Sequence, residues 1–239
     1  MDIQYKTDTL TVPPPKPRGS DIFYPDSDGE PMAETDLHAN LLMNLRMTLD
    51  IFFAEREDVY VSGNLMFYYV EGDPTQVISP DVMVCFGIPK GNRTSYKTWE
   101  EKDVVPSVVI ELSSRGTWRK DFMEKKTLYE VLGVKEYYIF NPLEPKTAPA
   151  FTAYELKNGE FTAVKIENNC IKSEILGLDL IVEGKNLRLF DPATNQFLKT
   201  AEELAETVGE LSETVGELST ENDFLKAENE RLKKLLEKQ

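Results

Sequence analysis

The C-terminal tail, residues 198–239, carries the pattern that most restricts how this chain can fold. Apolar residues and two asparagines recur alternately four and three residues apart, and the sequence Glu-Thr-Val-Gly-Glu-Leu-Ser occurs twice in succession from Glu206. A seven-residue repeat of this kind predicts a coiled coil, in which helices bury a shared apolar seam. The seam consists of Leu204, Val208, Leu211, Val215, Leu218, Asn222, Leu225, Asn229, Leu232 and Leu236.

The residues along the seam also indicate the number and direction of the helices. Leucine at one seam position, with valine or asparagine at the other, favours a parallel pair, because a buried asparagine pairs best with its equivalent. In that register Glu221 of one copy meets Lys226 of the partner, and Glu228 meets Lys233 one heptad later. We therefore expect residues 204–236 to form a homodimer. An antiparallel or higher-order bundle is the main alternative, since a lone helix would leave the seam exposed to water.

The rest of the chain is long enough for one folded domain. The 239 residues can bury a single substantial core with an appendage. Residues 1–20 contain a proline-rich run that predicts an extended arm, which leaves residues 21–197 for the domain. No stretch approaches the roughly 18 apolar residues of a membrane span, and the N-terminus has no signal-peptide pattern. We expect a cytoplasmic protein.

Charge and the rarer side chains exclude several function classes. The net charge of −15 argues against a protein that coats nucleic acid through a broad basic face. Cys85 and Cys170 lie in apolar or strand-like stretches, which favours buried, reduced thiols over a disulfide or a zinc site. His38 is the only histidine, so a Ser-His-Asp or Cys-His mechanism is nearly excluded.

The order of the expected elements indicates an α/β or α+β domain. An amphipathic helix begins at Thr35 or Asp36 and continues to Phe53, and a second helix follows at residues 118–132, closed by Gly133. Strands rich in β-branched and aromatic residues are expected at 59–70, 82–86, 104–112 and 137–140, followed by a hairpin of 151–156 with 161–166. Several strands are apolar on both faces, which indicates a sheet covered by helices on each side.

Two carboxylates and one lysine stand out within this pattern. Asp81 follows Pro80 at the start of a strand, and Glu111 closes a fully apolar strand, where a charge is costly unless a positive group meets it. Lys125 shares a helical face with Tyr129, so we expect it to point inward. Two carboxylates holding magnesium or manganese, with a nearby ammonium, suit phosphodiester hydrolysis.

Each of these residues also fits a structural role. Asp81 could cap a turn, and Glu111 with Lys125 could form a buried ion pair without catalysis. A carboxylate-pair glycosidase would need no adjacent lysine, so Lys125 argues against it. Asp121 either pairs with Lys125 or favours the helix N-terminus, and we expect the second. Tyr129 is equally a site-lining hydroxyl or a core aromatic.

The order and spacing of several short motifs resemble the Uma-two family of putative restriction endonucleases, within the PD-(D/E)XK nuclease superfamily. The similarity covers roughly residues 20–190. The motifs are Pro80-Asp81-Val82, Val109-Ile110-Glu111-Leu112-Ser113-Ser114, Asp121 with Lys125 and Tyr129 at steps of four, and Gly133-Val134-Lys135-Glu136-Tyr137-Tyr138-Ile139.

This resemblance implies a restriction-endonuclease-like core of mixed β-sheet flanked by helices. It implies a magnesium site at Asp81, Glu111 and the Leu112 carbonyl, with DNA as substrate and a 5′-phosphate product. Ser113 stands where the superfamily pattern has lysine, and the family supplies the lysine from the following helix, at Lys125. Glu34 is a candidate additional acid, and its spacing from the lone histidine could place both on one metal. The alternative is an inactive or weakly active scaffold that acts through its coiled coil.

Overall fold

The computed structural model of the chain describes residues 12–13, 22–27, 35–114, 117–143 and 149–236. The chain divides into two units, Met1–Leu198 and Lys199–Gln239. Glu34 and nearly all of the expected arm at residues 1–20 lie outside the described residues. The expected α+β class is confirmed, because the first unit combines mixed and antiparallel sheets with helices.

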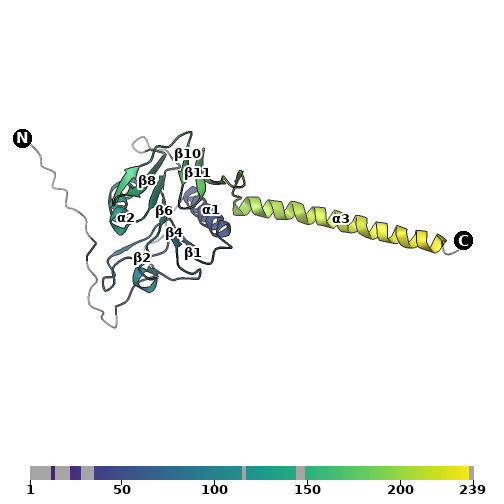
Figure 1. Ribbon diagram of the computed structural model, residues 1–239, viewed down its shortest axis with the longest axis horizontal. Coiled ribbons are helices and arrows are strands. Elements are labelled where there is room, and N and C mark those ends of the chain that lie inside the picture. Colours follow the sequence, from purple (N-terminus) through teal and green to yellow (C-terminus); the bar gives the residue numbers. More distant parts are fainter. Residues whose placement is uncertain (1–11, 14–21, 28–34, 115–116, 144–148, 237–239) are drawn as a thin grey trace, which may run out of the picture. The chain divides into compact units, whose positions relative to one another are not determined.

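The first unit is built around a six-stranded sheet with the strand order β1-β4-β6-β7-β8-β9 (Figure 1). β6 and β7 run parallel, and the other neighbouring pairs are antiparallel, so the sheet is mixed. The strands are β1 (Val59–Ser62), β4 (Val82–Phe86), β6 (Val108–Leu112), β7 (Glu136–Phe140), β8 (Phe151–Lys157) and β9 (Glu160–Ala163).

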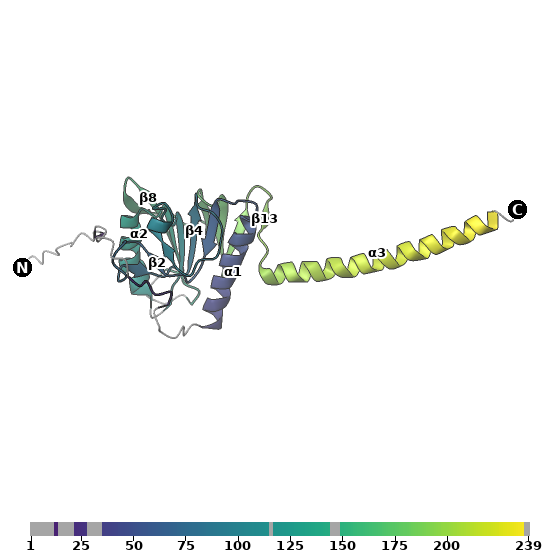
Figure 2. The ribbon, with the colours of Figure 1, turned by 90° about the horizontal axis from the view of Figure 1, so that it is seen from below.

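Each face of this sheet has its own helix and its own hydrophobic core. On one face, α1 (Asp36–Phe52) packs Leu41, Leu45 and Leu49 against the strands. On the other face, α2 (Lys126–Leu132) contributes Tyr129 to a core rich in aromatic side chains. Figure 2 shows α1 and α2 on opposite sides of the sheet. The central strands β6 and β7 are buried throughout, which explains why their sequences are apolar on both faces.

Two smaller sheets contain strands that the sequence did not reveal. One is antiparallel and consists of β10 (Cys170–Ser173), β11 (Leu178–Glu183), β12 (Asn186–Asp191) and β13 (Gln196–Phe197). In the other, β2 (Phe67–Tyr68) lies between β3 (Val77–Ile78) and β5 (Tyr96–Lys97), which precedes the 3-10 turn η1 (Thr98–Glu100). The single strand predicted for residues 59–70 is wrong, because the chain turns at Gly63 and Asn64, whose φ is 50°.

Two smaller predictions concern the hairpin after Pro142 and the cysteines. β8 and β9 pair around Asn158 and Gly159, whose φ angles of 53° and 86° suit a tight turn, as predicted. Both cysteines are free thiols. Cys85 is buried as expected, whereas Cys170 is only half-buried on a strand of the small antiparallel sheet.

The helix over the aromatic core begins near Trp118 and ends at Gly133, as its sequence predicts. Its middle differs from an ordinary α-helix, because Lys120–Lys125 (η2) form a π-helix that leads into α2. Gly133 closes the helix with a φ of 87°, in the left-handed region. A π turn accommodates an extra residue within a helix and occurs often at functional sites.

The second unit is one helix, α3 (Ala201–Leu236), as the heptad repeat predicts. With 36 residues it is about 54 Å long. The large side chains of its seam are exposed in the single chain: Val208, Leu211, Val215, Leu218, Leu225, Leu232 and Leu236. Pairing of this helix with another chain stays a prediction. Among the described residues, none of the helices has the length and apolar character that crossing a membrane requires.

Candidate active site

Asp81 and Glu111 stand opposite each other at the edge where β4 begins and β6 ends. Val82 faces Ile110 in the antiparallel register, so the next pair outward is Asp81 with Glu111. The Asp81 amide lies 3.4 Å from Glu111 Oε2 as its donor, and the Leu112 amide donates to Asp81 Oδ2 at 2.6 Å. The two carboxylates and the Leu112 backbone therefore share one site.

Lys125 reaches this site from η2. Its Nζ donates to Glu111 Oε2 at 2.7 Å, and the Tyr129 hydroxyl donates to Glu111 Oε1, also at 2.7 Å. Both oxygens of a fully buried carboxylate thus accept a hydrogen bond from the same helix. Lys125 itself is only 11% exposed. A buried carboxylate and a buried ammonium are tolerated here because each group is the hydrogen-bonded, oppositely charged partner of the other.

Asp121 belongs to the same group of charges. Its Oδ1 lies 3.3 Å from Lys125 Nζ, and its side chain is 2% exposed. The ion pair with Lys125, the less favoured of the two alternatives, is therefore present, and Asp121 also lies in the first turn of η2, as the expectation for the helix N-terminus requires. Two charges in contact away from water interact more strongly than a carboxylate with a helix end.

His38 is the residue that the sequence interpretation underestimated. It lies in the first turn of α1, where the Thr35 hydroxyl accepts from the His38 amide at 3.3 Å and caps the helix. Its Nε2 lies 3.6 Å from Asp81 Oδ1. A signal was present, because Leu41 and Leu45 follow His38 at three and seven residues, which sets all three on the inward face.

A cavity of about 250 Å³ opens beside this group of charges, and Glu111, which is fully buried, is not among the residues that line it. Its lining includes His38, Asp81, Asp121 and Lys125, with Ser113 and Ser114 on the loop after β6. Within the described part of the chain, Ser113 Oγ and Asp121 Oδ2 are buried and have no hydrogen-bond partner. Buried polar atoms without partners beside a polar cavity indicate a site for water or for a polar ligand.

Burial and the neighbouring charges shift the titration of the three main groups in different directions. Burial raises the pKa of Glu111 to about 8, although the positive charge of Lys125 opposes the shift. Burial also raises the pKa of Asp81, but the hydrogen bond from His38 and the charge of Lys125 outweigh it and hold that pKa below its ordinary value. Burial lowers the pKa of Lys125, but the negative charges of Glu111 and Asp121 outweigh it, so the ammonium keeps its proton.

Gly63 fixes the position of Asp81, a role that the sequence did not suggest. A Cβ at Gly63 would lie 2.6 Å from the Asp81 carbonyl oxygen, which is closer than side-chain atoms approach. The neighbouring Asn64 amide donates to the Pro80 carbonyl at 3.0 Å. The backbone after β1 is therefore pressed against the backbone before β4, and only glycine leaves room for this contact.

The donor set suits a hard divalent cation. Asp81, Glu111 and the Leu112 carbonyl offer oxygen atoms only, which magnesium and manganese prefer over sulfur or nitrogen. Among the residues that the structure describes, no group of three or more His, Cys, Asp and Glu side chains could hold a metal. Magnesium does not require such a cage, because it usually binds one or two carboxylates, several waters and a substrate phosphate. The residues present therefore fit magnesium.

The α+β domain thus brings two carboxylates and a buried lysine together at one end of a mixed sheet, and the family model that matches the chain is that of a nuclease-like protein. The chain belongs to the Uma2 (Uma-two) family, whose model is described as "Putative restriction endonuclease" and matches residues 10–183. The family resemblance drawn from the motifs is thereby confirmed.

One solved structure to which the chain is similar is described as "a putative nuclease belonging to DUF820 from Anabaena variabilis ATCC 29413". The two chains are 14% identical, with a TM-score of 0.45, over 63% of this chain and 80% of the other. No curated protein matches the sequence.

Proposed function

We propose that this protein is a magnesium-dependent endonuclease that hydrolyses phosphodiester bonds of DNA at Asp81, Glu111 and Lys125. The observation that carries the proposal is that Lys125 Nζ lies 2.7 Å from Glu111 Oε2, while Lys125 and Asp81 line the same cavity. Membership of a family described as restriction endonucleases supports DNA as the substrate.

In this proposal Asp81, Glu111 and the Leu112 carbonyl hold the cation. Bound magnesium supplies a Lewis acid for the scissile phosphate and lowers the pKa of a bound water. Manganese offers the same preference for oxygen ligands and could replace it. Asp81 is already ionised at neutral pH, so it can take the cation without first losing a proton.

Lys125 acts as a fixed cation and not as a base. Its pKa is raised by Glu111 and Asp121 against the effect of burial, so its amine stays protonated at neutral pH. An ammonium held in place can donate to the attacking water or to the phosphate oxygens as their charge increases. Asp121 and Tyr129 are positioning residues, because Asp121 holds the ammonium and Tyr129 holds the carboxylate of Glu111. Ser113 Oγ is a further donor at the cavity wall.

We further propose that residues 204–236 join two copies of the chain in a parallel coiled coil. The exposed seam of α3 and the opposite charges of Glu221 with Lys226, and of Glu228 with Lys233, support self-pairing. A dimer would carry two sites, as cleavage of both DNA strands requires. The same helix also favours a second candidate function, an inactive scaffold that acts only through α3.

Nicking of supercoiled DNA in magnesium separates the two functions. Wild type and Asp50→Ala, a control for an exposed aspartate on the outer side of α1, should nick the plasmid. Asp81→Ala should not. Nicking by Asp81→Ala at the wild-type rate would remove Asp81 from the site, and no nicking by any of the three proteins would favour the scaffold.

Calorimetric titration tests the metal separately from catalysis. Magnesium or manganese should bind wild type and Asp50→Ala with equal affinity, and binding should weaken strongly in Glu111→Gln, which loses a charged ligand. Equal binding by wild type and Glu111→Gln would exclude Glu111 as a ligand.

A further inference from the structure

A larger hollow lies beside the cavity of about 250 Å³ at Asp81 and Lys125, which we call the catalytic cavity. The two share one side chain. This hollow, which we call the hairpin pocket, has a volume of about 720 Å³ and lies between the β2–β3 hairpin and the helix η2–α2. Met66, Tyr69, Val77, Ile78 and Ser79 line it from the hairpin side. Lys125 lines both the hairpin pocket and the catalytic cavity, so a ligand in the pocket would lie next to the proposed metal site.

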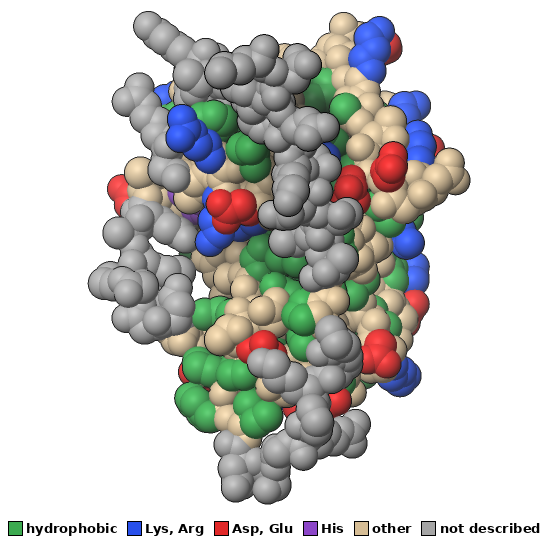
Figure 3. Space-filling view, turned by 90° about the vertical axis from the view of Figure 1, so that its left-hand side faces the viewer, with side chains coloured by type: hydrophobic (Ala, Val, Ile, Leu, Met, Phe, Trp, Pro, Cys, Tyr) green, Lys and Arg blue, Asp and Glu red, His purple; other side chains and the backbone are tan. Residues whose placement is uncertain are grey.

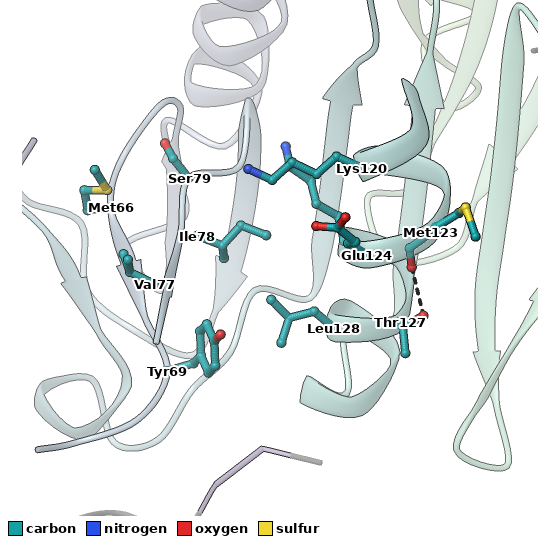
Figure 4. Close-up of a pocket in the computed structure, with 11 residues that line it drawn as sticks. Met66, Tyr69, Val77, Ile78, Ser79, Lys120, Met123, Glu124, Thr127 and Leu128 are labelled. Carbon is teal, nitrogen blue, oxygen red and sulfur yellow. Dashed lines mark hydrogen bonds between the residues drawn. The ribbon is translucent and has the colours of Figure 1, made fainter. Parts of the chain in front are cut away.

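The two ends of the hairpin pocket differ in chemistry. Figure 4 shows Ile78 and Leu128 facing each other across the pocket, with Tyr69 at one end and Ser79 and Lys120 at the other. The Tyr69 hydroxyl is held by Gln76 Oε1 at 3.2 Å, so its ring has a fixed partner on the hairpin. The pocket therefore offers apolar and aromatic walls for a flat ring, with Lys120 and Lys125 toward the catalytic cavity and one carboxylate, that of Glu124, beside Lys120.

Because the molecule as a whole is acidic, lysines that line a pocket indicate a negatively charged ligand. The chain as a whole carries a net charge of −15. Among the side chains described on the face in Figure 3, the lysines and arginines lie among acidic side chains along the right-hand margin and are scattered elsewhere, so none of this face is uniformly basic. Two lysines against one carboxylate leave the charged part of the pocket lining with a net positive charge, which matches a ligand with an apolar ring and a neighbouring phosphate better than a duplex held along a basic face.

Resting on the proposed function, we propose that the hairpin pocket receives an unpaired nucleobase of the strand being cut, with its phosphate at Lys120 and Lys125. Nucleobases that leave a duplex bind between aromatic and apolar side chains, and the volume lies within the roughly 300–1,000 Å³ of typical ligand sites. The substrate class is therefore DNA with unpaired residues, such as a single strand, a bulge or a mismatch.

Two tryptophan variants on the same helix test the pocket. Thr127 is an exposed residue of the pocket wall, whereas Val131, one turn later and 41% exposed, is not among the residues that line it. Thr127→Trp should fill the pocket, and Val131→Trp is the matched control. Fluorescence anisotropy with a labelled twelve-nucleotide single strand in EDTA should show roughly tenfold weaker binding for Thr127→Trp only, since the base would lose its stacking place in the pocket.

Tyr69→Leu provides a second variant that keeps apolar volume and removes the ring. It should weaken single-strand binding in the same direction, while magnesium binding by calorimetry stays at the wild-type value for all three variants. Wild type should also bind the single strand more tightly than the matching blunt duplex.

The outcomes separate this proposal from the proposed function. Unchanged single-strand binding by both Thr127→Trp and Tyr69→Leu would overturn the nucleobase site, even if wild type cuts DNA, and it is also the result expected if the pocket takes a peptide or a lipid. If wild type fails to cut any DNA in magnesium, the nuclease proposal fails. The binding comparison in EDTA still decides the pocket in that case.

Discussion

The end of the central sheet where β4 begins and β6 ends, and the helix α3, both differ from the usual pattern of buried apolar and exposed charged side chains. They differ from it in opposite ways. At the sheet edge, charged groups are buried: Glu111 is fully buried, and Asp121 is 2% exposed. Along α3, large apolar groups are exposed, and Val208 and Leu236 keep 65% and 73% of their surface. Folded proteins rarely tolerate either arrangement without a compensating partner.

The difference lies in where the compensating partner comes from. The buried charges compensate one another within the chain, through Lys125 and Tyr129, and leave the cavity as the place for a further ligand. The exposed seam of α3 has no such compensation among the described residues of its own unit. A buried charge cluster thus indicates an internal site, whereas an exposed periodic seam indicates association.

The largest effect is expected when the buried ammonium group of Lys125 is removed. Lys125→Met should lower the rate of DNA cleavage by roughly 100- to 1,000-fold, because a preorganised donor to the reacting phosphate is lost. Plasmid nicking measures the effect. Lys126→Met is the matched control, since that lysine lies next in the chain but interacts with Glu130 on the other side of the helix. Equal losses in both variants would show a general effect of charge and not a site.

The second test removes part of the external seam. Leu225→Ala should weaken dimerisation on the order of 100-fold, because each copy loses a large side chain from the buried seam. Light scattering over a concentration series measures the dissociation constant. Phe224→Ala is the control, because Phe224 is 69% exposed but lies outside the heptad seam. A monomeric wild type would contradict the coiled coil outright.

The third test concerns the glycine behind Asp81. Gly63→Ala should reduce cleavage by roughly tenfold, since the added Cβ would meet the Asp81 carbonyl oxygen at 2.6 Å and displace a proposed metal ligand. Gly209→Ala is the matched glycine control, because no atom lies within 4 Å of its added Cβ. It should leave cleavage unchanged and stabilise α3 by about 1 kcal/mol. Wild-type cleavage by Gly63→Ala would show that Asp81 tolerates the shift.

The fourth test concerns a dependence on pH that Glu111 should impose. Its pKa of about 8 means that a cation must displace a proton below that pH, so magnesium affinity should fall by about tenfold from pH 9 to pH 7. In EDTA, where no metal is bound, the stability of the folded protein should change with pH in the opposite direction to the magnesium affinity. A raised carboxyl pKa favours the folded state at low pH, so stability should decline as the pH rises from 4.5 to about 8.

Thermal unfolding and calorimetry across this range measure both effects. Glu111→Gln, which cannot titrate, should lose the decline of stability between pH 4.5 and about 8. A wild type whose stability and magnesium affinity are flat over the same range would show that Glu111 keeps an ordinary pKa.

The sequence predicted those parts of the molecule that depend on local pattern. The seam of α3, the helix over residues 118–132 and the buried strands β4, β6 and β7 follow from periodicity and from runs of β-branched residues. The contact of Lys125 with Glu111 also follows, because the helical phase and the cost of a buried carboxylate both required it.

The parts that were missed depend on contacts between distant segments. The strands β10–β13 are only partly buried, without the continuous apolar runs of β4, β6 and β7, and their pairing is set by the sheet as a whole. His38 meets Asp81 only once α1 lies against the sheet, and Gly63 matters only because the chain before β4 returns to it. The hairpin pocket likewise joins segments more than forty residues apart.

The π-helical turn at Lys120–Lys125 has a consequence for how this site can change. In a helix each residue adds about 100° of rotation, so deleting one residue between Asp121 and Tyr129 would turn the preceding side chains away from Glu111 by about that angle. A substitution alters one contact, but a deletion there would misalign Asp121 and Lys125 together. The spacing of this segment is therefore as much a part of the site as the identities of its acids and its lysine.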